Sequence, residues 1–142
     1  MKKFSIFMVV LLLSSVFLMA AAPKQEETVI EFWTTDNEEA RIDVYEALAE
    51  AFMAEYPEVD LRIVPIEEAG IAQRIATAQA ANRLPDIVRM GIERVSSFAA
   101  DGILDEDAAA ATIQAIGEDD FRAGPLAMVT NPETGKYSAV PY

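Results

Sequence analysis

The 142-residue chain contains no cysteine and no histidine. Without cysteine it can form neither a disulfide framework nor the lipid-modified cysteine of a lipoprotein. Without histidine it lacks Ser-His-Asp and Cys-His catalytic groups and histidine-based metal sites. Its six glycines are scattered and form no phosphate-binding loop. These absences exclude several large classes of enzyme, and we expect no cofactor and no bound metal.

Basic residues are scarce as well: 11 against 24 acidic residues, a net charge of −13. The acids are spread along the chain, which is typical of a soluble, self-repelling surface, although a cationic ligand is the alternative reading. This charge argues against a nucleic acid or an anionic membrane as partner. We expect a monomer.

The first 22 residues have the layout of a secretory signal peptide. Lys2 and Lys3 precede an uncharged run from Phe4 to Met19, and three alanines follow at residues 20–22. The run is shorter than the roughly 20 apolar residues that a membrane-spanning helix needs. We therefore expect a signal peptide over residues 1–22 and a mature protein that begins near residue 23, is periplasmic or extracellular, and is not a lipoprotein.

The rest of the chain alternates between strand and helix patterns. Strands are predicted where β-forming residues are concentrated, at residues 28–33, 60–65 and 87–90. Helices are predicted between a capping box at Asp36 and Glu39 and the stop at Pro57, and at residues 69–81 and 95–100. The β-α-β-α-β-α order predicts an α/β fold whose sheet is mostly parallel and has helices on both faces.

Two of these helices have apolar residues at helical spacing, which predicts the faces that they bury. In the first the set is Ile42, Tyr45, Leu48, Ala49, Phe52, Met53 and Tyr56; in the second it is Ile71, Ile75 and Ala78. Asn82 is the expected end of the second helix. Beyond Leu104 we expect a helix over residues 107–116, a short helical turn at 118–121, a turn at 131–135 and a strand at 136–140.

Candidate binding residues follow the predicted strands, because ligands in open α/β sheets bind at the carboxyl ends of the strands. Asp36 and Asn37 follow the first strand, and Glu93 and Arg94 follow the third. Asp36 and Asn37 could instead cap a helix, and Glu93-Arg94 could be a surface ion pair. Trp33 could stack on a sugar or belong to the core. Carboxylate pairs such as Glu67-Glu68 stand at helix starts, where acids are stabilising without a functional role.

Taken together, these motifs resemble the N-terminal portion of extracellular solute-binding proteins of the sugar-binding family 1, the receptors of ABC importers to which maltose-binding proteins are related. The resemblance covers most of the chain. Besides the leader, its motifs are Val29–Thr35, Ala51–Val59, Leu61–Pro65, Leu84–Val88, Phe98–Leu104 and Gly135–Tyr142.

The resemblance implies a periplasmic-binding-protein-like fold of type II with two lobes that close on a ligand. Residues 23–142 would be a partial N-terminal lobe without the second lobe. The function implied is binding of a sugar or oligosaccharide and its delivery to membrane permease subunits, without catalysis. Because half of the cleft would be missing, we expect weak or undetectable sugar binding by this chain alone.

The resemblance also implies roles for particular residues. Asp36 and Asn37 would supply polar contacts, and Glu93 and Arg94 would read sugar hydroxyls, with Trp33 nearby. Met90 stands where the maltose-type pattern has an aromatic residue, which argues against maltose itself. Tyr142 lies where the family crosses into the second lobe, and its ring would reach the cleft.

Three alternatives remain open. The acidity favours a receptor for polyamines or other cations, although Arg94 opposes it. A secreted glycoside-active enzyme would use Glu93 with a second acid. A sensor partner would present a lobe surface to a membrane receptor.

Overall fold

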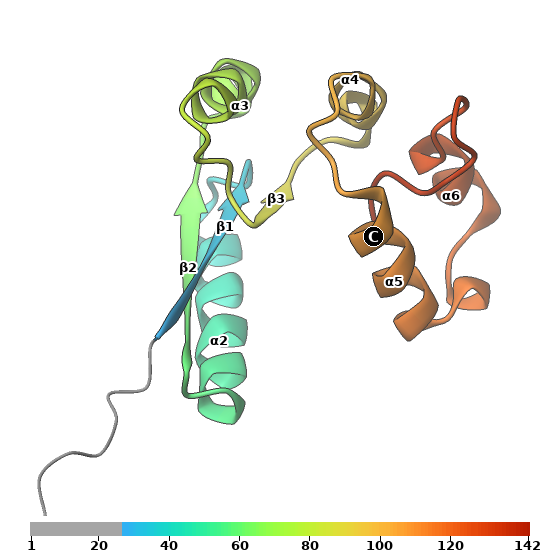
Figure 1. Cartoon of the computed structure of the whole chain (residues 1–142). Coiled ribbons are helices and arrows are strands. Elements are labelled where there is room, and N and C mark those ends of the chain that lie inside the picture. The colour runs from blue at the N-terminus through green and yellow to red at the C-terminus, as the bar shows by residue number, and fades with distance from the viewer. Residues whose placement is uncertain (1–26) are drawn as a thin grey trace, which may run out of the picture.

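The computed structural model describes residues 27–142, so the predicted signal peptide lies outside the described residues. Three parallel strands form its sheet in the order β2-β1-β3: β1 (Thr28–Thr34), β2 (Val59–Pro65) and β3 (Ile87–Arg89) (Figure 1). β1 pairs with β2 along its whole length, whereas only its last three residues pair with β3. The predicted parallel α/β fold is confirmed.

Neighbouring residues of β1 point to opposite faces, and helices cover both. Phe32 packs against Tyr45 of α2 (Glu39–Glu55), with ring centroids 5.5 Å apart. Trp33 points the other way, into a buried cluster with Ile71 and Ile75 of α3 (Ile71–Ala80). A 3-10 turn, Glu68–Gly70, leads into α3. The predicted helices on both faces of the sheet are therefore present.

The core lies on the α3 side of the sheet. α3, α4 (Val95–Ala100) and α6 (Ala123–Val129) contribute to it together with the ends of β1, β2 and β3. The buried side chains are Trp33, Ile66, Ile71, Ile75, Ala78, Met90, Val95, Phe98 and Val129. The predicted inward face of α3 is confirmed, and so is its end, where Asn82 takes a φ of 54°.

α2 differs from the prediction in two ways. Its N-cap is Glu38 and makes no side-chain capping bond, so the predicted Asp36 capping box is wrong; the Asp36 carboxylate is already bonded to Tyr45 and paired with Arg89. The predicted apolar face is also only partly buried, because β1 and β2 reach one side of it. The other side exposes Leu48, Phe52 and Tyr56. Val44, which was not part of the predicted face, is exposed as well, and we call these four residues the α2 stripe.

The C-terminal half contains α5 (Glu106–Ile116) and a 3-10 turn at Glu118–Asp120, both close to prediction. A further 3-10 turn, Ile92–Arg94, precedes α4. α6 was not predicted. Pro125 lies in its first turn, where the backbone N–H that proline lacks would have no helical partner. Nowhere in residues 27–142 does a helix reach the length and apolar character needed to cross a membrane.

The turn at residues 131–135 is confirmed: the Asn131 side chain accepts a hydrogen bond from the Glu133 amide, and Gly135 has a φ of 71°. The strand predicted at 136–140 is wrong. This segment makes an isolated antiparallel bridge, Thr130 to Tyr137, because among the described residues no strand lies beside the rest of it. The outer edge of β3 is thereby left unpaired within residues 27–142.

Candidate functional site

The loops that follow the three strands meet at one edge of the sheet. Backbone hydrogen bonds join the first two strand ends, from the Ile66 amide to the Thr34 carbonyl (2.8 Å), and the first to the third, from the Thr35 amide to the Arg89 carbonyl (3.2 Å). The Asn37 side chain also donates to the Ile66 carbonyl (3.3 Å). Polar residues after different strands are thus held in fixed positions along this edge, as the parallel topology requires.

Asp36 is the most strongly bonded side chain at this edge, and is 11% exposed. One carboxylate oxygen lies 2.8 Å from Arg89 Nη1 and 3.3 Å from Arg41 Nη1, and the other accepts from the Tyr45 hydroxyl at 2.7 Å. Burial, and then the hydrogen bond to Asp36, raise the pKa of Tyr45 above its ordinary value. Asp36 therefore ties α2 to β3 and has little remaining capacity to accept from a ligand.

Arg94 pairs with a residue that the sequence did not single out for binding. Its Nε lies 3.0 Å from Glu68 Oε1 but 3.8 Å from Glu93 Oε1. Hydrogen bonding from the Thr35 hydroxyl, and then from Arg94, holds the pKa of Glu68 below its ordinary value. Glu68 thus joins the ends of β1 and β3. The position of Glu68 after a strand could have marked it as a candidate binding residue. Its position at a helix start, where acids are stabilising, already explained why an acid stands there.

Glu93 lies beside this pair, and its side chain is 66% exposed. It folds back over Gly91, where a Cβ would collide with the Glu93 carboxylate. Gly91 therefore permits this orientation. Glu93 and Arg94 lie together, as predicted. The closer partner of Arg94 is nevertheless Glu68.

Trp33 and Met90 lie in the core rather than on the surface of this edge. Trp33 is 6% exposed, its indole N–H donates to Glu31, and the Arg74 guanidinium lies 4.6 Å from its ring. Met90 is buried in the same cluster. The geometry favours a core role for both residues. For Trp33, the sequence had left that role open beside stacking on a sugar.

Tyr142 lies near the edge and is 86% exposed. Its ring centroid is 5.0 Å from Arg89 Cζ, so this residue meets the end of β3. Of the predicted residues, Asp36, Asn37, Glu93, Arg94 and Tyr142 therefore lie along the carboxyl edge of the sheet.

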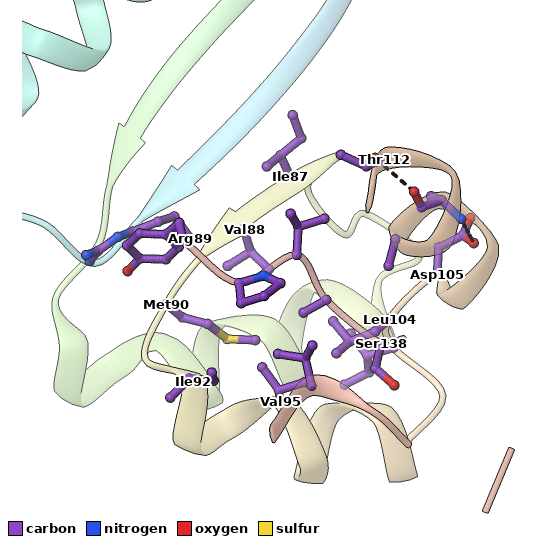
Figure 2. A pocket seen from close by; sticks show the side chains of 18 of the residues that line it. Ile87, Val88, Arg89, Met90, Ile92, Val95, Leu104, Asp105, Thr112 and Ser138 are labelled. Atoms are coloured by element: carbon purple, nitrogen blue, oxygen red, sulfur yellow. Dashed lines mark hydrogen bonds between the residues drawn. The ribbon is translucent and has the colours of Figure 1, made fainter. Parts of the chain in front are cut away.

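A cavity of about 1000 Å³ lies beside β3 (Figure 2), and Arg89, Met90 and Tyr142 are among the residues that line it. Its walls are mostly apolar side chains of β3, α4, α5 and the C-terminal segment, among them Ile87, Val88, Val95, Leu104 and Val140. Such walls offer few partners to a hydroxyl-rich ligand. The polar edge is therefore the better candidate site. Within residues 27–142 no three His, Cys, Asp or Glu side chains are grouped to hold a metal ion.

Comparison with known proteins gives the following relatives. No protein-family model matches the chain. The chain is 26% identical over 112 residues to the putative ABC transporter periplasmic-binding protein YcjN of Escherichia coli K12, covering 79% of this chain and 26% of that protein. It therefore spans about a quarter of the length of this curated relative.

Solved structures match the chain as well. The GacH receptor of Streptomyces glaucescens, solved unliganded and with acarbose, has 30% identity and a TM-score of 0.67 over 81% of this chain and 29% of that one. The sugar-binding protein MalE of Xanthomonas citri has 22% identity and a TM-score of 0.68, covering 80% of this chain and 28% of that one. CpMnBP1, solved with mannotriose bound, has 21% identity and a TM-score of 0.66, covering 78% and 27%.

MalE and CpMnBP1, at 22% and 21% identity, are similar to the chain in fold. GacH, at 30% identity, is similar in sequence as well. The resemblance derived from the sequence motifs is thereby confirmed. The chain has a periplasmic-binding-protein-like α/β fold and is similar to the maltose-binding-protein-like, sugar-binding receptors.

Proposed function

We propose that this chain supplies one wall of a receptor that binds a sugar or oligosaccharide and delivers it to the permease subunits of an ABC importer, without catalysis. The observation that carries the proposal is the group Asn37, Glu68, Glu93 and Arg94, which three different strand ends bring to one edge. The names of the matched proteins, a receptor solved with acarbose and a periplasmic-binding protein, support it.

The chemistry of this group suits sugar hydroxyls. Carboxylates accept hydrogen bonds, the guanidinium donates them, and the asparagine side chain does both. Arg94 is partly exposed and Glu93 largely so, and both can reach a ligand above the edge. Hydrogen bonds that involve charged groups are stronger than neutral ones, and polar groups in a fixed arrangement give such a site its specificity.

The domain arrangement and location belong to the same proposal. Residues 1–22 would direct export, and residues 23–142 would be part of the N-terminal lobe of a two-lobed receptor in the periplasm or outside the cell. Closure of two lobes buries a ligand from both sides. A single wall would bind weakly, which is why the test needs a method sensitive to millimolar affinity.

The test is a titration of the ¹⁵N-labelled chain, followed by NMR, with mannotriose, acarbose and, separately, spermidine. Sugars should shift the side-chain signals of Asn37 and Arg94 and the amides of residues 91–94. Arg94→Met should reduce these shifts several-fold, whereas Arg62→Met, the same charge change at the Asp60 pair on β2, should not. Shifts caused by spermidine and not by sugars would favour the cation receptor and contradict this proposal.

An enzymatic role for Glu93 has a separate test. A glycoside-active protein would hydrolyse a chromogenic glycoside and lose that activity in Glu93→Gln. We expect no turnover by either form, and turnover that depends on Glu93 would overturn the non-catalytic assignment.

A further inference from the structure

Three arginines at the polar edge are already paired with carboxylates of the chain itself. Arg94 Nε lies 3.0 Å from Glu68 Oε1, and Arg89 Nη1 lies 2.8 Å from the Asp36 carboxylate. Arg41 Nη1 lies 3.3 Å from the same Asp36 oxygen. The protein therefore balances these positive charges without a ligand.

Glu93 differs from the carboxylates of these pairs because it has no such close partner. Among the described residues its nearest cation is Arg94, whose Nε is 3.8 Å from Glu93 Oε1, which is too far for a hydrogen bond. The Glu93 side chain is 66% exposed. Its carboxylate thus remains open to a ligand, and its negative charge is less well balanced than that of Asp36 or Glu68.

The position of this carboxylate depends on a glycine. Glu93 folds back over Gly91, and a Cβ at Gly91 would collide with both carboxylate oxygens. The backbone of Gly91 is ordinary, with φ −62° and ψ 137°, so the residue contributes by lacking a side chain and not by an unusual φ. The carboxylate is thereby held beside the Glu68–Arg94 pair, where we propose that sugar hydroxyls bind.

We infer that Glu93 makes this site select sugars by charge, against those that carry carboxylate or phosphate groups and in favour of those that carry an ammonium group. The inference rests on the proposed function, because it narrows the class of sugar. An anionic group would meet Glu93 and no unpaired arginine among the three described above, and like charges in contact are costly. A sugar ammonium can instead donate a charge-assisted hydrogen bond to Glu93. The net charge of −13 acts in the same direction over longer distances.

The pairing of Arg94 also changes what this residue means for a cationic ligand. From the sequence alone, Arg94 opposed such a ligand. In the structure its charge is balanced by Glu68 at 3.0 Å, so an approaching ammonium group meets an ion pair rather than a single positive charge. A guanidinium has five N–H donors, and those that Glu68 does not use can bind hydroxyls. Neutral sugars therefore remain ligands of the same site.

Three trisaccharides of similar size test the inference. Mannotriose is neutral, the trimer of glucosamine is cationic and the trimer of galacturonic acid is anionic; at about pH 6 the last two are both charged. Titration of the ¹⁵N-labelled chain at low salt, followed by NMR, gives each dissociation constant. The unaltered chain should bind the glucosamine trimer more tightly than mannotriose and the galacturonate trimer more weakly, and added salt should reduce both differences.

Three variants locate the source of these differences. Glu93→Gln should reduce each of them about two- to fivefold, the range expected for one exposed charge pair. Glu55→Gln makes the same charge change at the end of α2, which precedes β2 and therefore lies at the amino end of the sheet, and should preserve them. Gly91→Ala keeps the net charge but displaces the carboxylate, so it should reduce them as well. Circular dichroism verifies that each variant is folded.

The outcomes separate this inference from the proposed function. Differences that survive in full in Glu93→Gln would overturn the inference, and so would an equal loss in Glu55→Gln, which would assign them to the net charge. Equal dissociation constants for all three trimers would also overturn it but leave the receptor function standing, because sugar would still bind. Binding of no trimer, or of the glucosamine trimer and spermidine without mannotriose, would contradict the receptor function itself.

Discussion

At the scale of single residues, the most informative side chains are those whose partners lie far away in the sequence. Asp36 meets Tyr45 and Arg89, and Glu68 meets Arg94. Neither pairing follows from local patterns, because hydrophobic periodicity and turn chemistry report on neighbours along the chain. The sequence pointed to Asp36 and Arg94 through their places after strands, but it could not identify their partners.

The Tyr45 hydroxyl provides a direct measure of the Asp36 cluster. Tyr45→Phe removes one of three donors to a nearly buried carboxylate, so unfolding should require about 1 kcal/mol less. Tyr56→Phe is the matched control, because that ring is exposed and its hydroxyl bonds to none of the described residues. Urea unfolding measures both variants. Equal stabilities would show that the hydrogen bond to Asp36 contributes little.

Glu106 should make the stability of the fold depend on pH in the acid range. Its carboxylate accepts from Asn131, Thr134 and Ser138, and the hydrogen bond from Asn131 is the largest cause that lowers its pKa from the ordinary 4.5. A lowered pKa in the folded state means that this contribution is complete above the unfolded value and is lost as the pH falls through the folded value. We expect the melting temperature to fall as the pH drops below about 4.5.

The Glu106→Gln variant tests this dependence. It should melt a few degrees lower than the unaltered chain at neutral pH, and the difference should shrink in acid. Glu133→Gln, in the turn that contains the donors Asn131 and Thr134, is the control and should follow the unaltered chain. A constant difference between Glu106→Gln and the unaltered chain across the acid range would rule out the carboxylate as the cause.

At the scale of elements, α5 shows how local chemistry sets a boundary. Asp105 caps the helix by accepting from the amides of Asp107 and Ala108. Asp105→Ala should cost about 1 kcal/mol of stability, whereas Asp105→Asn, which caps as well, should cost little. Thermal unfolding followed by circular dichroism distinguishes them. Similar losses in both variants would mean that the charge, rather than the cap, matters.

The elements also show what the sequence could predict. The strands and the helices α2 to α5 follow from local periodicity and stop signals, and Val95–Ala100 was predicted with its observed bounds. α6 was missed because Gly124 and Pro125 weaken its pattern, although both lie in its first turn. The segment 136–140 has strand-like residues, but a strand needs a neighbour, and within residues 27–142 only Tyr137 finds one.

At the scale of the whole molecule, two features oppose each other. The α2 stripe exposes Val44, Leu48 and Phe52 on the helix and Tyr56 at its C-cap, with Leu48 62% exposed. Patches of this kind promote association, whereas the net charge of −13 keeps copies apart. The oligomeric state, which we expect to be monomeric, should therefore depend on ionic strength.

Light scattering after size-exclusion chromatography measures this balance. At low salt the chain should be monomeric. At about 1 M salt, where charges are screened beyond roughly 3 Å, a fraction should associate. Leu48→Glu should remain monomeric under both conditions, and Ile116→Glu, an exposed apolar residue on α5, should behave like the unaltered chain. Association that persists in Leu48→Glu would assign it to another surface.

The short length of β3 should also affect how often its hydrogen bonds open. β1 exchanges hydrogen bonds with two neighbours, whereas β3 has three residues and, among the described ones, a partner on one side. Segments with so few bonds open at low free-energy cost. Deuterium should therefore enter the amides of β3 before those of β1. Arg94 lies in the turn that follows β3. A ligand that holds Arg94 in place would therefore slow exchange in a strand that it does not touch.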